Sequence, residues 1–170
     1  MTPPGSRSTA AATTGPSPNF AYLAHHDPRL AEVATRAERV LGLDPEGALN
    51  HLRLFGELVA KNAAARLGAY EAGEEHQVDR LRALRRHNLP ENVLQMLHGL
   101  RQAGNLATHE FVGSQQAAFT QLKVAFQLAI WFQRTFGNDR TFNPGPFVPP
   151  RDLRAETEEL RTELAALQRE

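Results

Sequence analysis

Cysteine is absent from the 170-residue sequence, which excludes disulfide bonds, thiolate nucleophiles and cysteine-based zinc or iron–sulfur sites. An excess of charge of one sign is absent too, because 19 basic and 19 acidic side chains balance to a formal charge of zero. Bulk attraction of a polyanion is therefore disfavoured, although a local basic patch could still contact nucleic acid. A lack of cysteine fits a reducing compartment, so we expect a cytoplasmic location.

Long apolar runs are also missing. The longest, residues 124–132, contains Gln127 and is far shorter than the roughly 20 residues that a membrane-spanning helix needs. The N-terminal segment lacks the apolar core of a signal peptide. Neither a glycine-rich phosphate loop nor a Gly-x-Ser-x-Gly elbow occurs, and the histidines lack the spacing of a zinc-binding helix. We therefore expect a soluble protein without membrane contact, bound metal or cofactor.

Composition divides the chain into four segments. Residues 1–18 are almost entirely Pro, Gly, Ser, Thr and Ala, and they bury too little apolar surface to offset their ordering entropy, so a disordered tail is predicted. Residues 19–141 carry the periodic apolar pattern of a helical bundle domain. Residues 142–150 contain four prolines and cannot be helical, so we expect an extended strap across the bundle. Residues 151–170 return to the pattern of a charged amphipathic helix.

Helix signals recur along the bundle segment. Two expected helices begin with an aspartate followed by a proline, at Asp27 and Asp44, and this pairing is favoured at helix N-termini. Apolar side chains recur at helical spacing near residues 28–41, 45–67, 77–87, 90–104 and 114–136. The last of these segments is the most apolar, and we expect it to lie at the centre of the core. With no internal repeat or strand alternation, the predicted fold class is all-α, with about five helices in the bundle.

One segment stands out for chemistry, because Arg101, Asn105 and His109 recur every four residues. If the helix continues through Gly104, all three lie on one face, with Thr108 beside them. A cation, an amide and an imidazole so arranged could bind phosphate, or act on RNA with His109 as acid or base and Arg101 as electrostatic stabiliser. In the alternative interpretation, Asn105 caps a helix that starts after Gly104, and the other two side chains fix contacts between helices.

A second candidate surface is the basic cluster formed by Arg82, Arg85 and Arg86 in the expected helix 77–87. It could touch a nucleic-acid backbone or a partner protein. Acidic residues just upstream, among them Asp79, favour a different interpretation, in which the cluster is a solvated helix face whose charges pair with one another.

The C-terminal segment carries Leu153, Leu160, Leu164 and Leu167 at near-heptad spacing among glutamates and arginines. Such a seam is typical of oligomerisation through a coiled coil, although Thr157 interrupts it and fewer than three heptads are present. The chain ends within this pattern. We expect this segment to be either a projecting helical tail or the beginning of a longer protein.

Several stretches together resemble a known family. They are residues 19–28, 52–57, 100–109, 129–132 and 147–150. They resemble the helical N-terminal domain of unknown function carried by the motor (R) subunits of type I restriction endonucleases and by related DEAD/DEAH-type helicases, over roughly residues 19–150. That domain is in turn similar to the HEPN superfamily of helical bundles. Many HEPN proteins are metal-independent RNases in which four to six residues separate an arginine from a histidine.

The resemblance implies an HEPN-like bundle in a restriction-modification or anti-phage defence machine, with the other subunits or domains of a restriction or helicase complex as partners. Asn105 and His109 match part of the HEPN motif, whereas seven residues separate Arg101 from His109. We therefore interpret the chain first as a non-catalytic accessory module that docks subunits or contacts DNA or RNA. A metal-independent RNase, and a homodimerisation module acting through the C-terminal leucines, are the alternatives.

Overall fold

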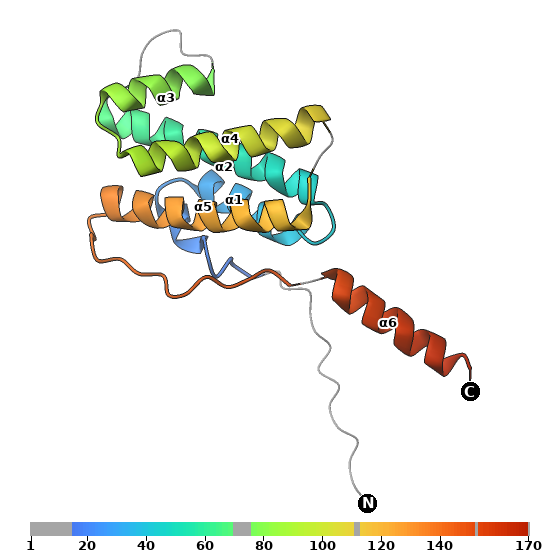
Figure 1. The fold of residues 1–170 in the computed structure, drawn as a ribbon. Coiled ribbons are helices and arrows are strands. Elements are labelled where there is room, and N and C mark those ends of the chain that lie inside the picture. The colour runs from blue at the N-terminus through green and yellow to red at the C-terminus, as the bar shows by residue number, and fades with distance from the viewer. Residues whose placement is uncertain (1–14, 70–75, 111–112, 152, 170) are drawn as a thin grey trace, which may run out of the picture.

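The computed structural model describes residues 15–69, 76–110, 113–151 and 153–169, and for residues 110 and 153–156 the backbone alone. The described part is helical and contains no strand (Figure 1). Its elements are the 3-10 helix η1 (Ala21–His25) and the α-helices α1 (Pro28–Val40), α2 (Pro45–Leu67), α3 (Gln77–Arg86), α4 (Glu91–Glu110), α5 (Gln115–Phe136) and α6 (Leu153–Leu167). This confirms the predicted all-α fold, with five helices in the bundle and a charged helix after it.

Side-chain caps define where the helices begin. The Asp27 carboxylate accepts a hydrogen bond from the Arg29 backbone N–H at 3.0 Å, and Asp44 accepts one from the Gly47 N–H at 2.8 Å. Each cap satisfies a backbone donor that the first helical turn leaves without a partner. Both helix starts predicted from the aspartate–proline pairs are therefore confirmed.

The central helix of the bundle is α2, which packs against α1, α3, α4 and α5 (Figure 1). The prediction that the segment 114–136 would be central is therefore wrong. Small residues on several faces of α2 let its neighbours approach closely; they are Ala48, Gly56, Ala60, Ala63 and Ala64, all buried. The helix α5 is more apolar but less enclosed, because Phe119, Ile130 and Trp131 are only partly buried.

Helix α4 runs without a break through Gly104 to Glu110, which corrects the expected end near Gly104. This glycine is buried where α4 crosses α2, and a Cβ atom there would lie 2.4 Å from Cβ of Arg53. Gly104 therefore serves the close approach of two helices and does not terminate one. The interpretation of Asn105 as the cap of a new helix is excluded, because Asn105 lies within α4.

The proline-rich segment 137–150 has no helix and lies along the bundle (Figure 1). The Phe147 ring packs against Phe119 and Phe126, with centroids 5.8 and 5.4 Å apart, and the Phe142 ring packs on Tyr22 at 4.6 Å. Val148 is attached through its backbone, while its side chain is largely exposed.

The described residues include parts of both terminal segments. Of the predicted disordered tail, residues 1–14 lie outside the described residues, whereas Ser17 is buried and its hydroxyl accepts hydrogen bonds from the Asn19 and Phe20 N–H groups at 3.1 Å. At the other end α6 stands apart from the bundle (Figure 1). Within the described residues, no helix combines the length and the apolar character that crossing a bilayer requires.

Candidate functional site

The candidate site begins with the α4 row, which we define as Arg101, Asn105 and His109. Because α4 is continuous, the three residues lie on one face, with about 6 Å of helix rise from each to the next. Arg101 and Asn105 are half-buried and His109 is exposed. Within the described residues, none of the three side chains forms a hydrogen bond or an ion pair. The described residues therefore give no polar contact through which this row would join α4 to another helix.

Helix α2 supplies the other wall of this site. The Thr108 hydroxyl contacts Asn50 on α2 and also lies 2.9 Å from the Gly104 carbonyl oxygen. One turn along α2 from Asn50, the stem of Arg53 lies over Gly104, and its Nη1 donates to Glu57 at 2.8 Å. Polar side chains of α2 therefore lie beside the α4 row where the two helices cross, a place that we call the α2–α4 crossing.

Two donors at the α2–α4 crossing have no acceptor among the described residues. The Nε atoms of Arg53 and Arg101 are both buried, and neither has a hydrogen-bond partner. A buried donor without a partner costs about 1–3 kcal/mol, and such groups are uncommon in native proteins. Both Nε atoms are covered by the protein's own atoms, so the crossing of α2 and α4 buries two donors that the described residues leave unsatisfied.

His98 connects the α4 row with the predicted basic cluster on α3. Burial lowers the pKa of His98, the positive charges of Arg101 and Arg85 lower it further, and Glu91 opposes them. The imidazole therefore lies within electrostatic reach of an arginine from each of the two candidate surfaces, Arg101 and Arg85. The sequence analysis did not single out His98.

The basic cluster itself has charge partners. Arg82 pairs with Asp79 at 3.4 Å, and Arg85 pairs with Glu91 at 3.2 Å. These pairs are exposed, so each contributes at most about 1 kcal/mol. Arg86 is also exposed. The arrangement supports the interpretation of a solvated, self-paired helix face.

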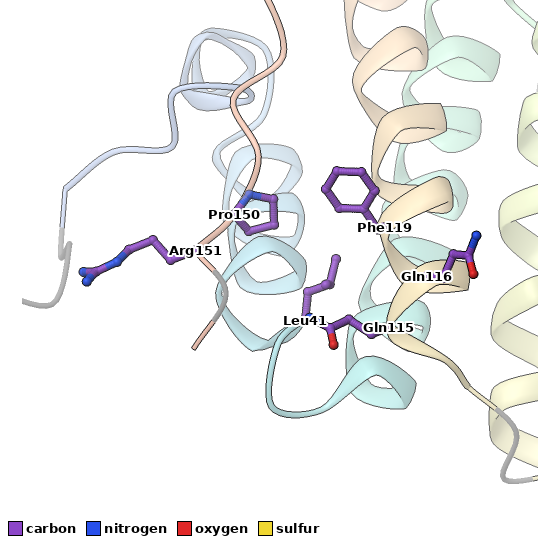
Figure 2. A pocket seen from close by; sticks show the side chains of 6 residues that line it. All are labelled: Leu41, Gln115, Gln116, Phe119, Pro150 and Arg151. Atoms are coloured by element: carbon purple, nitrogen blue, oxygen red, sulfur yellow. The ribbon is translucent and has the colours of Figure 1, made fainter. Parts of the chain in front are cut away.

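Two pockets in the described part of the chain lie away from the α4 row. Figure 2 shows a pocket of about 260 Å³ between the strap and the start of α5, lined by Leu41, Gln115, Gln116, Phe119, Pro150 and Arg151. A second one, of about 370 Å³, lies beside η1 and α1. Neither contains a residue of α4, so the α4 row is a surface feature. Among the described residues, no group of three or more His, Asp or Glu side chains is placed to hold a metal ion.

Sequence analysis missed Asn50 and Arg53. Both lie on α2, three residues apart, and each directly follows a leucine of the apolar stripe. That spacing was the available signal, but it does not tell which helix they would face. Only the crossing of α2 and α4 at Gly104 places them opposite the α4 row.

These observations define the class of the protein: an α-helical bundle domain with a row of polar side chains on the surface of α4 as its candidate binding surface. The chain is 32% identical over 133 residues to the type I restriction enzyme EcoKI endonuclease subunit of Escherichia coli strain K12. The match covers 78% of this chain but only 11% of that subunit. The chain therefore contains a restriction-enzyme-related domain that spans about a tenth of its relative's length. No protein-family model and no solved structure matches the chain.

Proposed function

We propose that this domain is a non-catalytic accessory module that docks onto other subunits of a cytoplasmic type I restriction machine used in anti-phage defence. The observation that carries the proposal is the α4 row, whose three polar side chains share one face and have no hydrogen-bond partner in the described part of the chain. The similarity to a restriction endonuclease subunit supports the setting. We also propose that the domain is an HEPN-like helical bundle.

The geometry favours docking over RNA cleavage. Arg101 and His109 are eight residues apart on one helix, which separates their Cα atoms by about 12 Å. Acid–base catalysis requires both groups within hydrogen-bond reach of one reacting phosphate. The Arg101 Nε is buried, whereas His109 is exposed, and neither described pocket encloses them. An open polar face of this kind suits recognition of a partner surface.

Binding to the restriction subunits of the same organism tests the proposal. We expect the purified chain to bind their assembly, and Arg101→Ala or Asn105→Ala to weaken binding roughly tenfold or more, because interface arginines are frequent hot spots. Affinity would be measured by biolayer interferometry at fixed salt.

The matched control is Arg36→Ala, which removes an exposed arginine from α1. Normal binding by both α4 variants would remove the α4 row from the docking surface. RNA cleavage by the pure chain in EDTA, lost in a folded His109→Ala variant, would overturn the non-catalytic assignment.

A further inference from the structure

We propose that α6 is a dimerisation helix that pairs, in parallel and in register, with α6 of a second copy of this chain. The observations that carry the proposal are the exposed leucines of α6 and the order of the charges that border them. The proposal is independent of the docking function of the α4 row, because the two surfaces lie on different elements.

The apolar seam of α6 has a defined heptad register. With Leu160 at position d, Leu153 and Leu167 also occupy d, and Thr157 and Leu164 occupy a. Leu160, Leu164 and Leu167 are each more than half exposed. Figure 1 shows α6 directed away from the bundle, so a second helix can approach its seam. The described bundle therefore leaves this apolar stripe uncovered.

The charges beside the seam favour a parallel pair. Position g of the register holds Glu156 and Glu163, whereas position e holds Arg154, Arg161 and Gln168. In a parallel pair, each g residue lies opposite the e residue of the next heptad in the partner helix. Glu156 of one copy thereby meets Arg161 of the other, and the two-fold symmetry of the pair repeats this contact.

An antiparallel pair would bring like charges together. It buries the same leucines, so apolar burial alone does not select the orientation. Position g then lies opposite g and position e opposite e, so glutamates face glutamates and arginines face arginines, which repel each other. The total charge of α6 does not oppose pairing of two copies, because three arginines and four glutamates in residues 153–169 nearly cancel.

Thr157 supports the same orientation. In a parallel, in-register pair an a residue packs against its own copy, so Thr157 faces Thr157 and Leu164 faces Leu164. In an antiparallel pair a residues pack against d residues, and all d residues of the α6 seam are leucines. A hydroxyl placed against leucine loses its contact with water, which costs free energy. A polar residue at one a position therefore also specifies the register.

The ion pair of Arg161 within its own helix does not prevent the contact with a second copy. Arg161 Nη1 lies 3.1 Å from Glu158 Oε1, and the two side chains are 72% and 71% exposed. So exposed a pair adds little stability, and Arg161 can therefore turn toward a glutamate of the partner helix.

The first experiment tests the orientation by thiol cross-linking, which the absence of native cysteine makes specific. Full chains carrying Leu167→Cys or Thr157→Cys are mixed and equilibrated in a glutathione buffer, and the disulfide-linked dimers are resolved by mass spectrometry. Parallel pairing predicts disulfides between identical variants, with a yield roughly tenfold or more above that of the exposed control Leu43→Cys. A predominance of disulfides between the two different variants, or yields no higher than the control, would overturn the proposal.

The second experiment tests the charges by sedimentation equilibrium. Arg161→Glu should weaken self-association roughly tenfold, because the two attractive contacts of the dimer become repulsive. Arg169→Glu is the matched control, since it makes the same charge change at position f, away from the seam, and should weaken association less than about threefold. Adding Glu156→Arg to Arg161→Glu exchanges the two charges and should restore the association of the wild-type chain.

A further control separates this effect from the stability of the helix itself. Arg161→Glu also removes the ion pair with Glu158, so Glu158→Gln, which removes only that pair, should leave self-association intact. Circular dichroism would verify that each variant keeps its helix content. Equal association of Arg161→Glu and Arg169→Glu, or no recovery in the double variant, would overturn the parallel arrangement.

Discussion

At the scale of single residues, Gly99 and Gly104 of α4 have opposite surroundings. A Cβ atom at Gly104 would lie 2.4 Å from Cβ of Arg53, whereas one at Gly99 would meet only the Gln121 side-chain oxygen, at 3.8 Å. Gly104→Ala should therefore lower the free energy of unfolding by about 1–3 kcal/mol, because α2 and α4 must separate. Gly99→Ala should raise it by up to about 1 kcal/mol, because alanine is the better helix former.

Urea unfolding of the two variants measures this contrast. Because they make the same substitution in one helix, their difference isolates the effect of the helix crossing. A Gly104→Ala variant as stable as Gly99→Ala would contradict the close approach of α2 to α4.

Among single residues, only part of the candidate site could be predicted from the sequence. The spacing of Arg101, Asn105 and His109 follows from local helix geometry, so their common face was predictable once α4 was continuous. Arg53 was not, because its relation to Arg101 depends on the relative position of two helices that are far apart in sequence. Gly104 was interpreted as a helix end for the same reason, since its packing role depends on Arg53.

At the scale of elements, Asn19 attaches the strap, residues 142–150, to the bundle through hydrogen bonds. Its side-chain oxygen accepts from the Val148 N–H at 2.9 Å, and its Nδ2 donates to the Val148 carbonyl at 2.8 Å and to Glu38 at 2.6 Å. Asn19 is almost fully buried, so these hydrogen bonds replace water for a polar side chain in the core. The strap is therefore held by one amide and by the rings of Phe142 and Phe147.

Glu38 makes this attachment dependent on pH. Burial raises the pKa of Glu38, while hydrogen bonds from Ser17 and Asn19 and the charge of Arg39 oppose the rise. A raised pKa means that the folded protein binds the proton more tightly than the unfolded chain. The stability that this provides is fully present below about pH 4.5 and is lost as pH increases through the raised pKa.

Glu38→Gln should remove this pH dependence, because glutamine keeps an oxygen acceptor toward Asn19 and carries no charge. The unfolding free energy of the variant minus that of wild-type should increase from pH 4 to pH 7, as measured by urea unfolding at each pH. Glu32→Gln, at an exposed ion pair on α1, is the control and should change stability by no more than about 0.5 kcal/mol at any pH. A constant difference for Glu38→Gln would show that Glu38 does not couple the strap to pH.

Local signals predicted the elements better than their arrangement. The N-caps Asp27 and Asp44 act within three residues of their partners, so the starts of α1 and α2 were predictable. The central position of α2 was not, because it follows from small residues on several faces, which a single apolar stripe does not show. The apolar character of α5 led to the wrong prediction of the central helix, since its large side chains also cover partly exposed surface.

At the scale of the whole molecule, α6 is the element without a described packing partner. Leu160, Leu164 and Leu167 are 66%, 59% and 71% exposed, and the side chain of Leu153 lies outside the described residues. Exposed leucines at near-heptad spacing favour self-association of helices. With fewer than three heptads, the association must be weak, because short helices gain little from pairing. This surface is on a different element from the α4 row, so one chain could use both.

We therefore expect a weak, concentration-dependent homodimer in sedimentation equilibrium, visible as a rising average mass at high protein concentration. The double variant Leu160→Gln/Leu164→Gln should remain monomeric, because glutamine has nearly the helix propensity of leucine but no apolar surface to bury. Leu43→Gln is the matched control, since Leu43 is equally exposed, at 65%, and lies outside α6 between α1 and α2. A dimer that persists in the double variant would place the interface elsewhere on the molecule. A constant monomer mass for wild-type at all concentrations would contradict self-association through the leucines of α6.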